Sequence, residues 1–378
     1  MTWPMIPVSE LCELAVDCVN KTAPTVEHET EFKMIRTTNV KGGFIDLKEV
    51  RFVMEDVFNK WTRRSRPQYG DVVLTREAPV GEVGRFTSND EKVFLGQRLF
   101  HYRPDRNKLD WNFLAYALQS PQIQGKFKGM GFGATVDHVR VGDAERLPIP
   151  CPPLNVQKRI GDTLSAYDDL IENNRRRIQL LEQAARLLYK EWFVHLRFPG
   201  HEHTQIIDGV PEGWEKKPLG TFAPLKYGKA LKNDDRVPGP FPVYGSSGIV
   251  GTHTKALVPG PTIIVGRKGN VGSVYWSPDD CHPIDTVYYI DSGNCSLFLY
   301  FALQQMTFIS TDVAVPGLNR DFAHSRLMLV AEKKILRLFE ETVSPLHQQM
   351  ELLKRQNASL AKARDLLLPK LMNGEVEV

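Results

Sequence analysis

The sequence predicts an α+β protein in which two similar strand-rich domains are accompanied by two long helices. Three observations support this prediction: a length of 378 residues, an internal repeat that spans most of the chain, and two apolar stripes with helical spacing. A chain of this length usually folds into two or three domains. We therefore expect one structural unit to be present twice, with a pseudo-two-fold relationship between the copies.

The repeat is clearest in two short apolar segments. These are FLAYALQ (113–119) and FLYFALQ (298–304), which lie 185 positions apart and share five of seven residues. Upstream of them, YGDVVLTREAPVGEVG (69–84) aligns with VPGPTIIVGRKGNVGSV (258–274) at two glycines, an arginine and two valines. Each upstream segment is typical of a β-branched strand, a glycine turn and a second strand. Because a repeat of this size defines the architecture, we expect each copy to be a strand-rich domain followed by a helix.

Each long helix is predicted from apolar residues at alternating steps of four and three, the 3.5-residue period of a coiled-coil seam. The first seam contains one strongly polar residue, Asn174, and the second is more polar, with Thr342 and Gln356 at seam positions. We expect the two stripes to pack against each other, because neither small domain could cover a helix of roughly 40 residues, about 60 Å long. The alternative is that each stripe belongs to a long core helix. The principal seam positions are Ile160, Leu164, Tyr167, Ile171, Asn174, Ile178, Leu181, Ile335, Phe339, Leu346, Leu353 and Leu360.

These patterns also predict the domain boundaries. Strand-rich domains are expected over residues 1–150 and 199–330, and the helical segments over residues 151–198 and 331–378. Such a chain could hold two domains at a fixed separation, which requires a stiff spacer and not a flexible linker.

The composition and the missing motifs argue against several other classes of protein. No stretch approaches the eighteen or so apolar residues of a membrane span, and the N-terminal residues lack a signal-peptide pattern, so we expect a cytoplasmic protein. The five cysteines are scattered without a CxxC pair, which predicts neither a disulfide framework nor a zinc site. Neither a GxxxxGK[ST] phosphate loop nor an NPPY-type or DPPY-type tetrapeptide is present. We expect no catalytic and no metal-binding residues.

Basic and amide side chains are concentrated at predicted turns of both domains. The segments are KWTRRSR (60–66), KYGKALK (226–232), GSSG (245–248), GRKGN (266–270) and GLNR (317–320). Lysine and arginine neutralise phosphates, and arginine and asparagine can donate to base edges. Each segment alone is typical of a solvated loop, but their recurrence in both copies favours DNA binding. The candidate DNA-binding residues are Arg36, Lys41, Lys60, Arg63, Arg64, Arg66, Arg76, Lys226, Lys229, Lys232, Ser246, Ser247, Arg267, Lys268, Asn270, Asn319 and Arg320.

Several of these segments have a recognisable order. Each helical segment comes after a glycine turn, which lies in GDVVLTREAPVGEVG in the first copy and in IIVGRKGNVG in the second. The first helical segment begins within LPIPCPPLNVQKRIGDTLSAYDDLIENNRRRIQLLEQ (147–183), and the second closes with LLLPKLMNGEVEV (366–378). With these motifs in this order, the sequence resembles the specificity (S) subunit of type I restriction–modification enzymes over essentially its whole length.

This resemblance implies that residues 1–150 and 199–330 are target-recognition domains, each of which recognises one half of a bipartite site in double-stranded DNA. It also implies that the two helical segments pack antiparallel as a spacer and bind two methyltransferase (modification) subunits. The chain itself would be a non-catalytic subunit of a host-defence complex that is both a DNA adenine methyltransferase and a type I site-specific endonuclease.

The resemblance assigns the cofactors to other chains. S-adenosylmethionine, ATP and Mg are expected on the partner subunits, which include restriction (motor) subunits, and none is expected on this chain. Three alternatives remain: the specificity chain of a related methyltransferase–nuclease system, an enzyme that acts alone on DNA, and a coiled-coil scaffold without DNA recognition.

Overall fold

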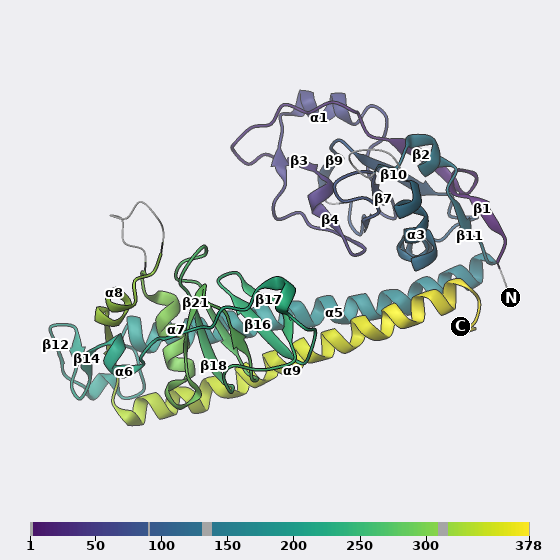
Figure 1. Ribbon diagram of the computed structural model, residues 1–378. Helices are drawn as coiled ribbons and strands as arrows, with labels where there is room; N and C mark the ends of the chain where they lie inside the picture. The colour runs from purple at the N-terminus through teal and green to yellow at the C-terminus, as the bar shows by residue number, and fades with distance from the viewer. Residues whose placement is uncertain (1–2, 90, 131–137, 309–316, 378) are drawn as a thin grey trace. The chain divides into compact units, whose positions relative to one another are not determined.

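The structure, a computed structural model, describes residues 3–89, 91–130, 138–308 and 317–377, and its chain forms two compact units (Figure 1). Unit 1 consists of Met1–Asn174 with Arg355–Val378, and unit 2 consists of Arg175–Lys354. Each unit therefore contains one strand-rich domain together with part of each long helix.

The strand-rich domain of unit 1 has two principal sheets. The larger is antiparallel, with the strand order β2 (Cys12–Asp17), β10 (Leu99–Pro104), β7 (Val72–Thr75) and β8 (Val83–Arg85). The smaller has the order β6 (Arg51–Phe52), β3 (Phe32–Ile35) and β9 (Lys92–Leu95), and β3 pairs parallel with β9. The other elements are β1 (Met5–Pro7) paired with β11 (Pro148–Pro150), β4 (Val40–Lys41) paired with β5 (Phe44–Ile45), α1 (Glu55–Trp61), α2 (Trp111–Gln119), α3 (Pro121–Met130) and α4 (Val141–Glu145).

Unit 2 repeats this arrangement. Its larger antiparallel sheet has the order β15 (Lys226–Tyr227), β21 (Val287–Ile290), β18 (Thr262–Gly266) and β19 (Val274–Ser277). Its smaller sheet has the order β17 (Gly248–His253), β16 (Phe241–Gly245) and β20 (His282–Pro283), again with one parallel pair. The other elements are β12 (Ile206–Ile207) paired with β13 (Val210–Pro211), β14 (Glu215–Pro218) paired with β22 (Leu327–Val330), α6 (Leu219–Phe222), α7 (Leu297–Gln305) and α8 (Arg320–Ser325).

The equivalence of the two units extends to single hydrogen bonds. The turn after β7 closes when the Gly81 N–H donates to the Thr75 carbonyl over 2.9 Å, and the turn after β18 closes when the Gly272 N–H donates to the Gly266 carbonyl over 2.9 Å. Gly81 and Gly272 have φ values of 85° and 78°, in the left-handed region that glycine adopts most easily. The predicted internal repeat is confirmed, and these glycines are the conformational reason why its turn motif recurs.

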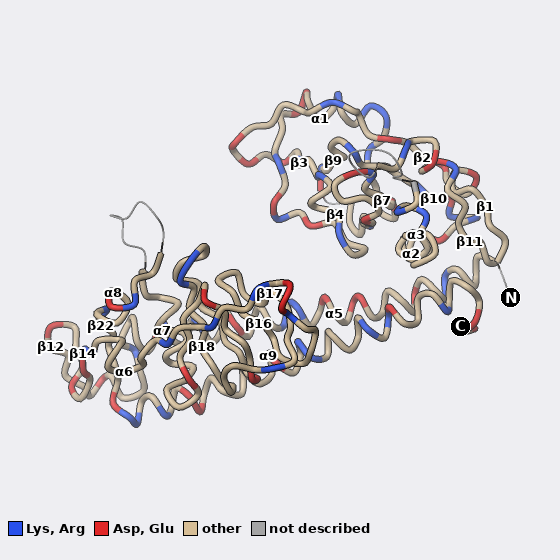
Figure 2. Tube along the Cα trace, in the orientation of Figure 1, with Lys and Arg blue, Asp and Glu red and all other residues tan. Residues whose placement is uncertain are grey.

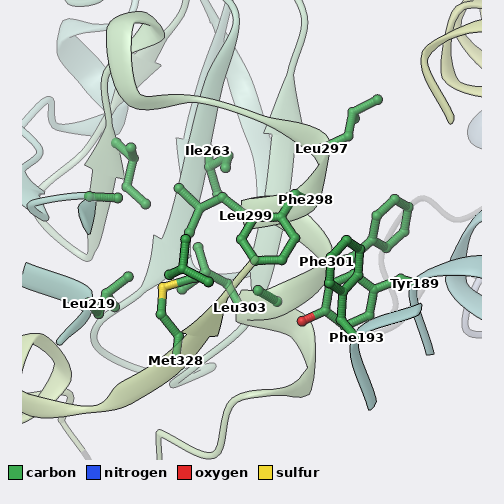
Figure 3. Packing of buried hydrophobic residues seen from close by; sticks show 14 of the residues in the cluster. Tyr189, Phe193, Leu219, Ile263, Leu297, Phe298, Leu299, Phe301, Leu303 and Met328 are labelled. Atoms are coloured by element: carbon green, nitrogen blue, oxygen red, sulfur yellow. The ribbon is translucent and has the colours of Figure 1, made fainter. Parts of the chain in front are cut away.

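The two apolar segments that revealed the repeat are α2 and α7. Asp110 caps α2 by accepting from the Phe113 N–H over 2.8 Å, and Ser296 caps α7 by accepting from the Leu299 N–H over 3.1 Å. Both helices are buried in the apolar cores of their own units, and Figure 3 shows Phe298, Leu299 and Phe301 of α7 among the side chains of the unit 2 core. The near-identity of the segments therefore reflects a shared packing position.

The long helices are α5 (Leu154–Tyr189), continued by the π-helical turn η3 (Lys190–Val194), and α9 (Lys333–Met372). They run antiparallel in both units. In unit 1, Asp168 and Asn174 of α5 contact Arg364 and Asn357 of α9, so residue numbers rise along one helix as they fall along the other. In unit 2, Tyr189 packs on Phe339, with their ring centroids 6.1 Å apart. The predicted antiparallel pairing of two long helices is confirmed.

Every principal seam position is buried or half-buried, but the prediction was wrong for two polar positions of α9. Thr342 and Gln356 are exposed, whereas Val343, His347 and Met350 are buried. The physical reason is that the buried stripe of this helix shifts by one residue, as an α-helix with 3.6 residues per turn does when it is not supercoiled throughout. The ends of both stripes also contact the adjacent domain, since Ile160 and Phe339 belong to the apolar cores that contain α2 and α7.

Candidate nucleic-acid interface

In unit 2 the structure brings several of the predicted basic residues together around Tyr227, an exposed residue of β15. The Cζ atoms of Arg267 and Arg320 lie 5.0 and 4.9 Å from the centroid of the Tyr227 ring. Arg267 follows β18 directly, and its carbonyl accepts from the Leu318 N–H over 2.8 Å, which brings the start of α8 and Arg320 to this position. Lys226, the neighbour of Tyr227, forms an ion pair with Asp291.

A second group of predicted residues surrounds the glycine turn after β18. Lys268 and Asn270 are exposed on this turn, and the Asn270 N–H lies 3.4 Å from the Ser246 hydroxyl. The Ser246 carbonyl accepts from the hydroxyls of Ser273 and Tyr275 over 2.7 and 3.2 Å. The turn and the β16–β17 hairpin are thus held together, and they present a lysine, an amide and the exposed Ser247.

The remaining predicted residues of unit 2 are placed differently. The Asn319 side-chain oxygen caps α8 by accepting from the N–H groups of Asp321 and Phe322 over 2.8 and 3.0 Å. Lys229 is held through its backbone, because its N–H donates to the Pro283 carbonyl over 3.0 Å, and its side chain is exposed. Lys232 is exposed at the start of the short 3₁₀ turn η5 (Asn233–Asp235).

In unit 1 the basic segment after α1 is only partly available for a ligand. The Arg64 guanidinium forms an ion pair with Asp17 over 2.6 Å and also donates to the Cys18 carbonyl over 3.3 Å. The Lys60 Nζ lies 5.6 Å from the centroid of the Trp61 ring, and the Arg66 Cζ lies 5.1 Å from the centroid of the Phe58 ring. Arg63 is exposed. The segment therefore presents cations and an indole ring on one short stretch of chain.

The other predicted residues of unit 1 come from separate elements. Arg76 follows β7, and its Nε donates to the Val139 carbonyl over 2.9 Å. Arg36 lies at the start of the 3₁₀ turn η2 (Thr37–Asn39), where its guanidinium is 3.4 Å from the Glu49 carbonyl. Lys41 is exposed in the β4–β5 hairpin. Figure 2 shows acidic segments interleaved with the basic ones along the chain.

Sequence reasoning missed two exposed tyrosines that lie beside arginines. Tyr227 stands in the KYGKALK segment, whose lysines are among the predicted DNA-binding residues, and the centroid of its ring is 5.1 Å from that of the buried Tyr288. In unit 1, the centroid of the Tyr69 ring lies 5.2 Å from the centroid of the Trp111 ring and 5.9 Å from the Arg106 Cζ. The available signal was the alternation of aromatic and basic residues, a pattern found where proteins bind nucleic acid by stacking and charge together.

A buried ionic network in unit 1 was also missed. Asp168 of α5 accepts from Arg85 of β8 over 3.2 Å and from the Tyr116 hydroxyl of α2 over 2.5 Å, and it pairs with Arg364 of α9. The side chains of Asp168 and Arg85 are only 1% and 4% exposed. This network joins the strand-rich domain to both long helices within unit 1.

The cysteines show no sign of a nucleophilic or redox role. All five are free, and burial raises the pKa of the Cys12 and Cys295 thiols to about 12 and that of Cys281 to about 11. These thiols are therefore protonated at neutral pH, whereas the thiolate is the nucleophile and metal ligand. Among the residues that the structure describes, no group of three or more His, Cys, Asp or Glu residues could hold a metal ion.

No helix in the described part of the chain combines the length and the apolar character that crossing a membrane requires.

Comparison with known proteins identifies the family. Two relatives, the type I restriction enzyme MjaIX specificity subunit of Methanocaldococcus jannaschii and the HindI specificity subunit of Haemophilus influenzae, are each 24% identical to this chain. The alignments cover 87% and 81% of this chain and 82% and 86% of the relatives. The fold is similar to that of the type I restriction–modification S subunit of M. genitalium, with a TM-score of 0.61, 21% identity and coverage of 98% and 96% of the two chains.

The family model described as the type I restriction modification DNA specificity domain matches residues 2–183 and 211–339. The two matches fall on the two copies of the repeat, and together they span most of the chain. The chain therefore belongs to the family of type I restriction–modification DNA specificity subunits.

Proposed function

We propose that this chain is the DNA sequence-specificity subunit of a type I restriction–modification complex, and that each strand-rich domain recognises one half of a bipartite DNA site. The observation that carries the proposal is the repeated turn, which places Arg76 after β7 in unit 1 and Arg267 after β18 in unit 2. An arginine at a turn can donate two hydrogen bonds to a guanine edge or bind a phosphate. Two such surfaces in one chain suit a target with two half-sites.

The long helices supply the rest of the proposed role. They form the spacer that fixes the distance between the half-sites, and they bind two methyltransferase subunits. Exposed leucines on α5 and α9 give both helices apolar side chains that a bound methyltransferase subunit would cover. These are Leu170, Leu180, Leu187, Leu352 and Leu366, each of which is more than half exposed.

In this proposal the chain is non-catalytic. S-adenosylmethionine is held by the methyltransferase subunits, which methylate adenine, and ATP and Mg are used by restriction (motor) subunits that join the same complex. The complex acts in the cytoplasm, because its proposed substrate is the DNA of the cell and of invaders.

The test is to map methylated bases by single-molecule sequencing of DNA from cells that express this chain with its neighbouring methyltransferase. The expected result is a bipartite motif with methylated adenines and a gap of fixed length. Exchange of the unit 2 domain for that of another specificity subunit is expected to change one half-site only. A methylated site with a single undivided sequence, or no methylation by an active methyltransferase, would contradict the proposal and favour a scaffold role.

A further inference from the structure

The Tyr227 cluster of unit 2 holds two guanidinium groups against one exposed aromatic ring. The Tyr227 side chain is 47% exposed at the edge of the four-stranded sheet. Because the Cζ atoms of Arg267 and Arg320 lie 5.0 and 4.9 Å from its ring centroid, they are at most about 10 Å apart. This upper limit is close to the Debye length at physiological salt, about 8 Å, so the two positive charges are only partly screened from each other.

The contacts of these two arginines leave their charge largely uncompensated. The Arg267 guanidinium donates to the Asp285 carbonyl, a neutral group, over 3.2 Å. The Arg320 Nε is buried without a hydrogen-bond partner. Neither guanidinium forms an ion pair with a carboxylate in the part of the chain that the structure describes. The cluster is thus pre-arranged to accept an electron-rich ligand between or beside its two arginines.

The equivalent position in unit 1 has the opposite character. In the sheet of unit 2, Tyr227 of β15 lies opposite Tyr288 of β21, and Tyr288 lies opposite Val265 near the end of β18. In unit 1 the corresponding strand register places Asp17 opposite Phe100, and Phe100 opposite Leu74 near the end of β7. Asp17 therefore occupies the position of Tyr227. Asp17 neutralises Arg64 there. The cluster is therefore a property of unit 2 and not of the shared fold.

We propose that Tyr227 is a positioning residue that holds Arg267 and Arg320 as a two-pronged donor for the DNA half-site recognised by unit 2. The ligand chemistry is a pair of closely spaced hydrogen-bond acceptors, which on DNA is either the O6 and N7 edge of guanine or a backbone phosphate. The ring face fixes the guanidinium planes by cation–π contact, so less side-chain freedom is lost when the donors meet DNA. This inference rests on the proposed function.

The experiment uses the complex of the full chain with its methyltransferase, and compares Tyr227→Ala and Tyr227→Phe with the unaltered chain. We expect Tyr227→Ala to raise the KM for DNA about tenfold and to leave kcat at saturating DNA unchanged. The reason is that loss of one good bidentate contact weakens DNA binding by about this factor. Tyr227→Phe keeps the ring face and is expected to restore the KM. Arg320→Gln, which removes a charge and keeps most of the side chain, is expected to reproduce the effect of Tyr227→Ala.

Two further readouts separate the possible sources of the acceptors. If the arginines contact a guanine edge, methylation mapping of Tyr227→Ala shows relaxed preference at one base of one half-site. If they contact a phosphate, the motif is unchanged and the slope of log affinity against log salt falls by about one. Tyr69→Ala is the matched control, because Tyr69 also lies beside an arginine but belongs to unit 1, and it should leave the unit 2 half-site unchanged.

The proposal is overturned if Tyr227→Ala keeps the KM, the motif and the salt slope of the unaltered complex. It is also overturned if Tyr227→Phe is as impaired as Tyr227→Ala, because the hydroxyl and not the ring face would then be responsible. Failure of the proposed function gives a different result: the unaltered complex itself then methylates no bipartite site.

Discussion

The side-chain amides of Asn174 and Asn357 meet across the two long helices in unit 1, where the Asn174 Nδ2 donates to the Asn357 Oδ1 over 3.0 Å. The Asn357 Nδ2 lies 3.4 Å from the Ile171 carbonyl, one turn earlier on α5. Asn174 is only 7% exposed. A buried polar pair of this kind specifies one register of two helices, because any shift leaves both amides without partners.

The first prediction is a double-mutant cycle on this pair. Asn174→Leu alone is expected to lower the free energy of unfolding by about 1–3 kcal/mol, because it leaves the Asn357 amide without its partner. Replacement of both residues by leucine should recover most of that loss, since no unpaired amide remains in the seam. Urea denaturation of the four proteins measures the coupling, and a value below about 0.3 kcal/mol would show that the pair is not an energetic unit.

A second prediction concerns the carboxylate of Asp168, which connects β8, α2 and both long helices in unit 1. Asp168→Ala leaves the buried Arg85 guanidinium without its counter-charge, and loss of one partner of a buried pair costs about 3–5 kcal/mol. Asp365→Ala is the control, because Asp365 also pairs with Arg364 but its side chain is 63% exposed. The control should change the free energy of unfolding by less than about 1 kcal/mol. Equal losses in the two variants would contradict the prediction.

The ionic network also marks the limit of what the repeat could predict. The repeat equates Asp168 with Val343, Arg85 with Trp276, and Tyr116 with Phe301, so the ionic group of unit 1 is replaced by apolar and aromatic side chains in unit 2. A repeat predicts that two positions are equivalent in space, but it does not predict which chemistry each copy uses there. The contact between Asp168 and Arg364 joins residues 196 positions apart, and no local pattern indicates it.

The duplicated sheets, the glycine turns and the long helices could be predicted because each depends on local spacing. The positions of the buried stripe in α9 could not, since the choice between Thr342 and Val343 depends on which face meets α5 and α7. The Tyr227 cluster was missed for a related reason. Its arginines come from two segments that become neighbours only when the Leu318 N–H donates to the Arg267 carbonyl.

A third prediction is a pH dependence that originates at Asp71 in unit 1. Burial raises the pKa of this carboxyl, but donation by His101 over 2.7 Å and by Arg103 over 2.8 Å outweighs burial and holds the pKa below its usual value of 3.8. A carboxyl whose pKa is lowered by folding stabilises the folded state above the unfolded pKa, and that contribution is lost as pH falls through the folded pKa.

The free energy of unfolding is therefore expected to exceed that of Asp71→Asn at about pH 5, and the excess is expected to shrink below about pH 4. Urea titrations at a series of pH values measure this difference. If the difference between the two proteins stays constant down to pH values well below 4, the Asp71 carboxylate is not the source of the acid sensitivity.

The last prediction tests the spacer role of the long helices with two adjacent residues of α5. Ile171 is 5% exposed in the seam, whereas Leu170 is 51% exposed on the outer face. Ile171→Gln places a polar group in the seam and weakens helix pairing, while the apolar cores around α2 and α7 are unchanged. The variant should keep its recognised half-sites and lose discrimination between DNA substrates whose half-sites are separated by different spacer lengths. Leu170→Gln, which alters the proposed partner-binding surface and not the seam, should keep the discrimination between spacer lengths even if its methylation rate falls. Methylation rates on a series of spacer lengths measure this directly, and full discrimination by Ile171→Gln would mean that the seam does not set the distance between the half-sites.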